Sequence, residues 1–304
     1  MMNDYLVRLV CLCLTAFFVV HLAAGALVRW ITPRGARALR RVRPRLAART
    51  TLLMRWSPAA LGLLVVAVLC VPSYLRFEPG ETGEEIGPAC LLGAGLALAV
   101  WAAAIVRGLR QVVRSRRYIR DGKSRRRPLV ALAGILRTRL LISPVVVDAL
   151  TAEQLDAALR HERAHGAARD NLKRLLLAFT PGLLPGLNGL AAAERHWARF
   201  TEWAADDDAV RGDPDRALAL ASALVRVARL GSAAVPLASS LLDGEDLSER
   251  VDRLLRPAAP ESRRVRGDAL AAGVAAAGIA ALACLALRPA TLESAHYLLE
   301  HLVR

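Results

Sequence analysis

The sequence predicts a mainly α-helical membrane protein with about four transmembrane helices and a cytoplasmic α+β domain that carries a short β-hairpin. Long apolar runs, an uneven distribution of arginine and a change to amphipathic patterning after residue 107 support this fold class. Apolar residues make up 55% of the 304 residues, and the mean hydropathy is +0.34. Both values are high for a soluble protein.

Four apolar runs have the length of a membrane-spanning helix: residues 5–31, 52–75, 86–106 and 269–287. Each approaches or exceeds the roughly 20 apolar residues that cross about 30 Å of hydrocarbon. The first run is longer than the apolar core of a signal peptide, and Asp4 precedes it. We therefore expect it to be retained as a span rather than cleaved as a signal peptide.

The net charge of +15 predicts the orientation of these spans. Arginine is concentrated in three segments, residues 29–50, 107–128 and 253–267, whereas residues 76–87 are acidic. Lysine and arginine accumulate on the cytoplasmic side of membranes, so the N-terminus is expected outside. The predicted organisation is three spans with a basic inner loop (1–106), a cytoplasmic domain (107–268), a fourth span (269–287) and a short outer tail (288–304).

The same charge distribution indicates what the chain binds. The basic segments are expected to contact anionic membrane lipid. We expect no direct binding of nucleic acid, because the sequence has neither a nucleic-acid-binding motif nor a basic face studded with aromatic residues. All five cysteines lie within predicted spans, at positions 11, 13, 70, 90 and 284, and none forms a CxxC pair. Neither a thiolate metal site nor a disulfide framework is therefore indicated.

The predicted cytoplasmic domain begins with two elements. Residues 128–148 contain two short β-branched and leucine-rich runs around a polar turn, which predicts a hairpin. A helix follows over about 152–170, since Thr151 and Gln154 have the spacing of a capping box. On this helix His161 and His165 lie one turn apart, with Glu162 after the first histidine.

This HExxH spacing is typical of zinc peptidases. Two imidazoles one turn apart can bind one ion, and the intervening glutamate acts on a water molecule. A catalytic zinc usually has a third protein ligand, and Glu202 is the leading candidate because Asp206 follows it one turn later as a carboxylate that could orient a histidine. Glu194 and His196 are the alternatives. The competing interpretation is an ordinary polar helix face, on which these side chains pair with neighbouring arginines.

A family resemblance supports the zinc interpretation. The stretch HERAHGAARDNLKRLL, preceded by LLISPVVVDALTAEQLDAAL and followed by EWAADDDA, resembles the BlaR/MecR-type antirepressor metallopeptidases, which are membrane gluzincins, over about residues 128–256. The family's motifs fall on His161, Glu162 and His165, and then on Glu202, Ala205, Asp206 and Ala209. Its R-x-D motif is partly kept at Arg169 and Asp170, so Asp170 is a further candidate site residue. LSERVDRLL at 247–255 resembles the family's helix before its last span.

The resemblance implies a zincin-like metallopeptidase domain in a bacterial inner membrane, with the active site on the cytoplasmic side. The implied substrate is a cytoplasmic BlaI/MecI-like transcriptional repressor, the chain itself, or both. Antibiotic-sensing members carry an outer penicillin-binding domain after the last span, and the 17 residues of 288–304 are too few for one. An HtpX-like quality-control protease and a catalytically inactive membrane scaffold remain as alternatives.

The implied mechanism has zinc on His161, His165 and Glu202, and Glu162 as the group that moves the water's proton. Candidates for stabilising the oxyanion are Tyr118, Arg195 and His196. The predicted hairpin either is a plain structural element or aligns an extended peptide substrate along its edge.

Residues 175–193 are apolar and uncharged and could be mistaken for a further span. Pro181, Gly182, Pro185, Gly186 and Gly189 interrupt any continuous helix there. A crossing at this point would also place Glu202 on the opposite side of the membrane from both histidines. We therefore expect a membrane-surface or re-entrant segment that covers the site.

Overall fold

The structure is a computed structural model. It describes residues 2–77, 86–120, 130–134, 139–184, 189–230, 239–240 and 247–256, together with a few single positions between 288 and 297. The predicted fourth span (269–287) lies outside the described residues, as does most of the predicted outer tail. The described part of the chain is mostly helical, as predicted.

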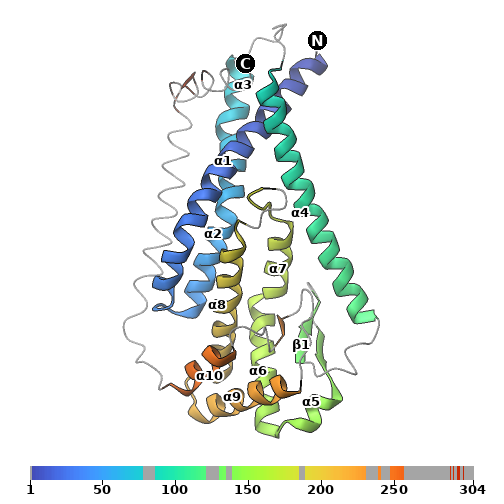
Figure 1. Ribbon diagram of the computed structural model, residues 1–304, viewed down its shortest axis with the longest axis vertical. Helices are drawn as coiled ribbons and strands as arrows, with labels where there is room; N and C mark the ends of the chain where they lie inside the picture. The colour runs from blue at the N-terminus through green and yellow to red at the C-terminus, as the bar shows by residue number, and fades with distance from the viewer. Residues whose placement is uncertain are drawn as a thin grey trace.

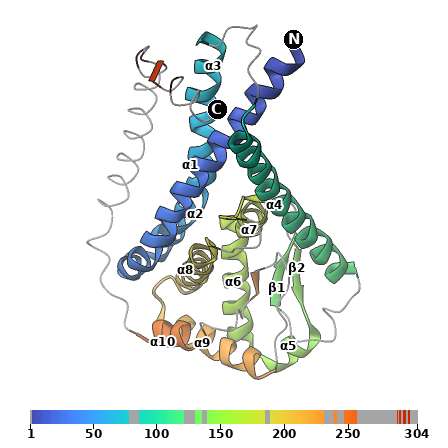
Figure 2. The same ribbon diagram turned by 45° about the horizontal axis from the view of Figure 1, so that its top comes forward.

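Within the described residues, three helices are long and apolar enough to cross a membrane, so the structure supports a membrane protein. They are α1 (Met2–Leu39), α2 (Pro44–Val65) with its continuation through the π-helical turn η1 (Val66–Cys70) and α3 (Val71–Phe77), and α4 (Pro88–Arg120). Figures 1 and 2 show α1 and α4 crossing near the N-terminus and diverging toward the opposite end of the molecule. Helix α7 lies in the opening between them.

These helices extend beyond the apolar runs that predicted them. α1 continues through the arginine-rich residues to Leu39, and α4 continues past residue 106 to Arg120. Arginine is a good helix former, and its long apolar stem lets the charged group reach water from a helix that leaves the membrane. The basic inner loop predicted between the first two spans is therefore mostly helix, with only residues 40–43 between α1 and α2.

A small sheet and six helices form the rest of the described chain. The strands β1 (Val130–Ala133), β2 (Arg139–Ile142) and β3 (Ser239–Ser240) have the order β2-β1-β3, and β1 pairs antiparallel with both neighbours. The predicted hairpin is therefore present, with Val130 opposite Ile142. The helices are α5 (Pro144–Ala149), α6 (Ala152–Ala168), α7 (Asp170–Phe179), α8 (Ala191–Val210), α9 (Pro214–Arg229) and α10 (Leu247–Leu255).

The core of this second half lies between α6, α8 and α9. Ala157 and Ala158 of α6 are buried against Leu220, Leu224 and other apolar residues of α9, and their small side chains let the helices approach closely. Asp213 caps the N-terminus of α9, and its Oδ1 accepts hydrogen bonds from the backbone N–H groups of Asp215 and Arg216 at 3.0 and 3.2 Å. This core holds α6 and α8 side by side.

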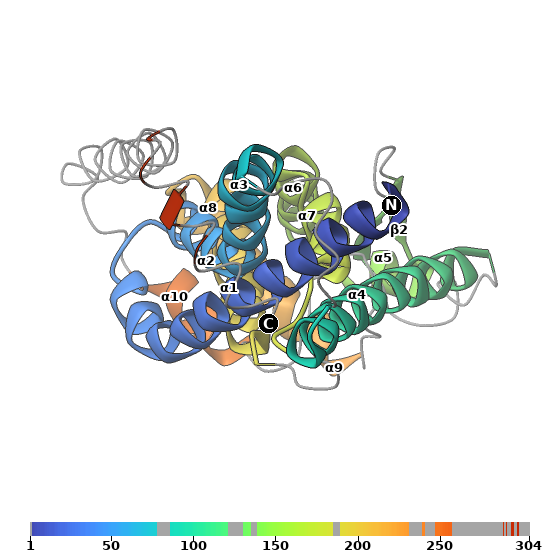
Figure 3. The same ribbon diagram turned by 90° about the horizontal axis from the view of Figure 1, so that it is seen from above.

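The membrane helices pack on the same α8. Ala47 of α2 is buried against Phe200 and Trp203, and Leu52 is buried with Trp197. Figure 3, seen from above, shows α8 behind α2, and α7 packs against α4. Helix α8 therefore belongs both to the membrane bundle and to the core with α6 and α9.

Candidate metal centre

Helix α6 carries the predicted histidine pair. The capping box is present: Thr151 Oγ1 accepts from the Gln154 backbone N–H at 3.3 Å, and Gln154 Oε1 accepts from the Thr151 N–H at 3.2 Å. About two and three turns farther along, His161 and His165 are 0% and 1% exposed. Their Nε2 atoms are 3.1 Å apart, and their rings meet edge to face. Two fully buried imidazoles facing each other do not form an ordinary solvated helix face.

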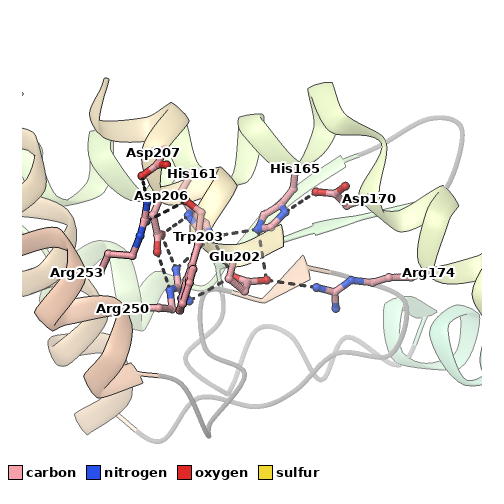
Figure 4. Close-up of polar contacts among 10 residues, drawn as sticks. All are labelled: His161, His165, Asp170, Arg174, Glu202, Trp203, Asp206, Asp207, Arg250 and Arg253. Carbon is pink, nitrogen blue, oxygen red and sulfur yellow. Dashed lines mark hydrogen bonds and ion pairs between the residues drawn. The ribbon is translucent and has the colours of Figure 1, made fainter. Parts of the chain in front are cut away.

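Helix α8 brings Glu202 to the same point (Figure 4). Its Oε2 lies 3.4 Å from His161 Nε2, and its Oε1 lies 3.6 Å from His165 Nε2. One ligand atom from each of these three residues lies within 4.8 Å of the other two. The three predicted ligands thus meet at one point, although Glu202 lies about 40 residues from the two histidines in the sequence. Because the three ligand atoms meet at one point, they cannot lie on opposite sides of a membrane.

A carboxylate lies behind each imidazole. His161 Nδ1 is 2.9 Å from Asp206 Oδ1, and His165 Nδ1 is 2.9 Å from Asp170 Oδ2. A carboxylate facing Nδ1 favours the tautomer that carries a proton there, so the lone pairs of both Nε2 atoms point toward each other and toward Glu202. Asp206 has the orienting position that its spacing from Glu202 predicted.

This arrangement fits a divalent cation. Two lone pairs and a carboxylate at these distances repel one another unless a proton or a metal ion lies between them. Zinc–nitrogen bonds of about 2.0–2.1 Å with tetrahedral angles separate two nitrogens by about 3.3–3.4 Å, close to the 3.1 Å found here. A nitrogen and oxygen donor set with neutral imidazoles is typical of zinc sites.

Asp170 reaches His165 because the chain reverses direction between α6 and α7. Arg169 ends α6 in the left-handed conformation, with φ 54° and ψ 40°, so that Asp170 begins α7 with its side chain turned back toward α6. Lys173 Nζ donates to the other oxygen of Asp170 at 2.9 Å. Asp170, a further candidate in the sequence, therefore has the same position behind His165 that Asp206 has behind His161.

Two arginines complete the cluster, and sequence patterning did not single them out. Arg250 of α10 is 2% exposed. Its Nε and Nη2 donate to the two oxygens of Asp206 at 2.9 and 2.7 Å, and its Nη1 lies 3.2 Å from Glu202 Oε2. Arg174 of α7 donates from Nη2 to Glu202 Oε1 at 3.3 Å. Each oxygen of Glu202 therefore has a guanidinium beside it.

The cluster changes the protonation of its members. Burial alone would lower the pKa of His165, but the Glu202 carboxylate and the hydrogen bond to Asp170 raise it to about 10. Burial would likewise lower the pKa of His161, but Asp206 and Glu202 raise it above the usual value of a histidine. Burial would raise the pKa of Asp206, but Arg250 and His161 lower it to about 2. The buried carboxylates therefore favour the protonated form of both histidines when no metal is bound.

Glu162, the predicted proton carrier, is fully buried on α6. Its negative charge contributes to the raised pKa of both His165 and Arg250.

The alternative ligands lie elsewhere. Glu194 pairs with Arg55 of α2, with 2.7 Å between Oε1 and Nε, and His196 stacks on Phe200 with ring centroids 6.4 Å apart. Neither belongs to the converging group of ligand atoms among the described residues. Of the candidates for stabilising an oxyanion, Arg195 is exposed, and the side chain of Tyr118 lies outside the described residues.

No family model, no curated protein and no solved structure matches this chain.

Proposed function

We propose that the chain is a membrane-embedded zinc metalloendopeptidase of the BlaR/MecR type with a zincin-like catalytic domain. One observation carries the proposal: the four predicted residues of the HExxH and glutamate motif, His161, Glu162, His165 and Glu202, are buried together, with the two imidazoles and the Glu202 carboxylate converging on one point. A surface helix that uses these residues for solubility would expose them to water.

The chain's own residues have separable roles in this proposal. Zinc on His161, His165 and Glu202 supplies Lewis-acid chemistry toward a peptide carbonyl and a water molecule. Glu162 accepts the proton of the attacking water and delivers it to the departing amine. Asp206 and Asp170 hold the two imidazoles in the tautomer that presents Nε2 as a ligand.

The charge distribution favours a site on the cytoplasmic side of a bacterial inner membrane. The basic connection between α1 and α2 lies at the same end of the molecule as the site helices, because Arg40 pairs with Glu249 of α10 at 3.1 Å and Arg45 pairs with Asp208 of α8. Lysine and arginine accumulate on the cytoplasmic side. A peptidase there acts on cytoplasmic protein, and we propose a BlaI/MecI-like transcriptional repressor, this chain itself, or both as substrate.

The test is proteolysis by the detergent-purified chain loaded with zinc. We expect cleavage of a co-purified repressor or of the chain itself, and loss of cleavage in Glu162→Gln with the zinc content unchanged. Full cleavage by zinc-loaded Glu162→Gln would contradict the assigned role. Cleavage of unfolded membrane proteins but of no repressor would favour the HtpX-like alternative, and zinc binding without any cleavage would favour an inactive scaffold.

A further inference from the structure

The connection between α7 and α8, residues 180–190, enters the membrane bundle. The structure describes it except for residues 185–188. His21 of α1, which is 0% exposed, places Nε2 2.7 Å from the carbonyl oxygen of Gly182. Figure 1 shows the upper end of α7 between α1 and α4, at the level of the apolar helices. The apolar segment predicted to be re-entrant therefore contacts the first span through a buried polar side chain.

The other two spans each contribute an arginine. Arg55 of α2 is 1% exposed, donates from Nη2 to the Thr180 carbonyl at 3.2 Å and pairs with Glu194 in the first turn of α8. Arg107 of α4 donates from Nε to the Ala178 carbonyl at 3.0 Å and also hydrogen-bonds to Thr180. The carbonyls at the C-terminal end of α7 have no partner within the helix, and they carry the negative end of its dipole.

Close apolar contacts accompany these polar ones. A Cβ on Gly25 of α1 would lie 2.4 Å from Leu183 Cδ1, and a Cβ on Gly108 of α4 would lie 2.5 Å from Phe179. A Cβ on Gly108 would have no room against the Phe179 ring, and one on Gly25 would force the Leu183 side chain to shift. The end of α7 and the described part of the connection therefore contact α1, α2 and α4 through both polar and apolar side chains.

Ionisable side chains within spans are costly in free energy and usually serve a function. Here each of the three described spans contributes one ionisable side chain. All three side chains contact the end of α7 or the connection that follows it, and this segment lies between the ligand-carrying helices α6 and α8. Helix α7 carries Asp170 and Arg174, which contact His165 and Glu202. Glu194 and Glu202 lie eight residues apart on α8, which is about 12 Å along the helix.

We propose that His21, Arg55 and Arg107 are positioning residues that fix the α7–α8 connection and thereby set the placement of Glu202 relative to the histidine pair. The inference rests on the metal-binding part of the proposed function. It makes three side chains of the membrane spans determinants of metal affinity, although none of them is a metal ligand.

The test is a titration of detergent-purified, metal-free full-length protein with Co²⁺, followed by its visible absorption. We expect Arg55→Gln and Arg107→Gln to weaken Co²⁺ binding about tenfold, the magnitude typical of residues that support a metal site from outside its ligands. The intensity of the absorption bands should also change. Arg55→Lys should restore much of the affinity, because an ammonium can still pair with Glu194.

Matched controls separate positioning from general stability. Arg49→Gln on α2 and Arg110→Gln on α4 remove exposed arginines from the same helices and should leave the titration unchanged. Gly93→Ala adds a Cβ 2.6 Å from Thr15 Cγ2 in the contact between α1 and α4, so it should lower thermal stability without altering Co²⁺ affinity. Unchanged affinity in Arg55→Gln and Arg107→Gln, or an equal loss in Gly93→Ala, would overturn this inference alone. A folded parent that binds no Co²⁺ would overturn the metal site as well.

Discussion

Arg250 donates hydrogen bonds to both oxygens of Asp206, whose Oδ1 lies 2.9 Å from His161 Nδ1. The chain of contacts thus runs from α10 through α8 to the first histidine of α6. Because Arg250 also lies 3.2 Å from Glu202, a single buried guanidinium supports one ligand directly and another through a carboxylate.

Replacing Arg250 should therefore weaken metal binding. We expect Arg250→Gln to lower zinc affinity by about 10- to 100-fold, since Asp206 and Glu202 would lose the charge that holds them in place. Competition with a chelating dye measures this. Arg253→Gln on the same helix removes the ion pair with Asp207 and the hydrogen bond to Trp203, outside the cluster, and should have a much smaller effect. Equal losses of zinc affinity in the two variants would show that Arg250 acts only by holding α10 in place.

Asp170 should support zinc binding through His165, as Asp206 does through His161. Asp170→Asn can keep a hydrogen bond to His165 but removes the negative charge that stabilises its Nδ1 proton. We expect about tenfold weaker zinc binding from this change, with the helical content by circular dichroism unchanged. A zinc affinity equal to that of the parent would contradict the orienting role.

The backbone at Arg169 should be sensitive to side-chain shape. Its left-handed conformation is strained for a β-branched residue. Arg169→Val should lower the free energy of unfolding by about 1–2 kcal/mol and should also weaken zinc binding, because Asp170 would shift. Arg169→Gly should keep zinc affinity close to that of the parent. Denaturant titration with and without zinc measures both effects, and equal stability of the two variants would argue against a required left-handed turn.

Zinc binding should release protons. His165 is protonated at pH 7 in the metal-free protein, because its pKa is raised to about 10, and a ligand nitrogen must be deprotonated. Zinc affinity should therefore rise with pH between about 6 and 9. Calorimetry in two buffers of different ionisation enthalpy counts the released protons. Equal observed heats in the two buffers would contradict this protonation state.

The same raised pKa should influence the stability of the metal-free chain. A folded-state pKa above the unfolded value stabilises the fold below the unfolded pKa of histidine, about 6.5. This contribution is lost as the pH rises toward about 10. Thermal unfolding of the metal-free protein from pH 6 to 9 should show declining stability, and His165→Gln should remove much of that decline.

Spacing along single helices predicted the centre of the site. His161 and His165, and likewise Glu202 and Asp206, lie four residues apart, and each pair projects from one helix face whatever the rest of the chain does. The capping box at Thr151 also predicted where α6 begins, because it depends only on residues close in sequence. The apolar runs predicted three helices for similar reasons, although their ends extend into the basic segments.

Features that depend on tertiary contacts were harder to predict. Arg169 adopts a left-handed conformation that glycine or asparagine would have indicated, so the turn that brings Asp170 to His165 had no sequence signal. Arg250 is one of 42 lysines and arginines, and its burial depends on how α10 packs on α8. The two-residue strand β3 is too short to carry a pattern.

The most direct test of the metal site is the metal content of detergent-purified protein by elemental emission. The parent should contain about one zinc per chain, and His161→Ala and Glu202→Ala should contain almost none, whereas His196→Ala should retain the parent's content. A well-folded parent without zinc, or zinc retained in both ligand variants, would contradict the three-ligand site.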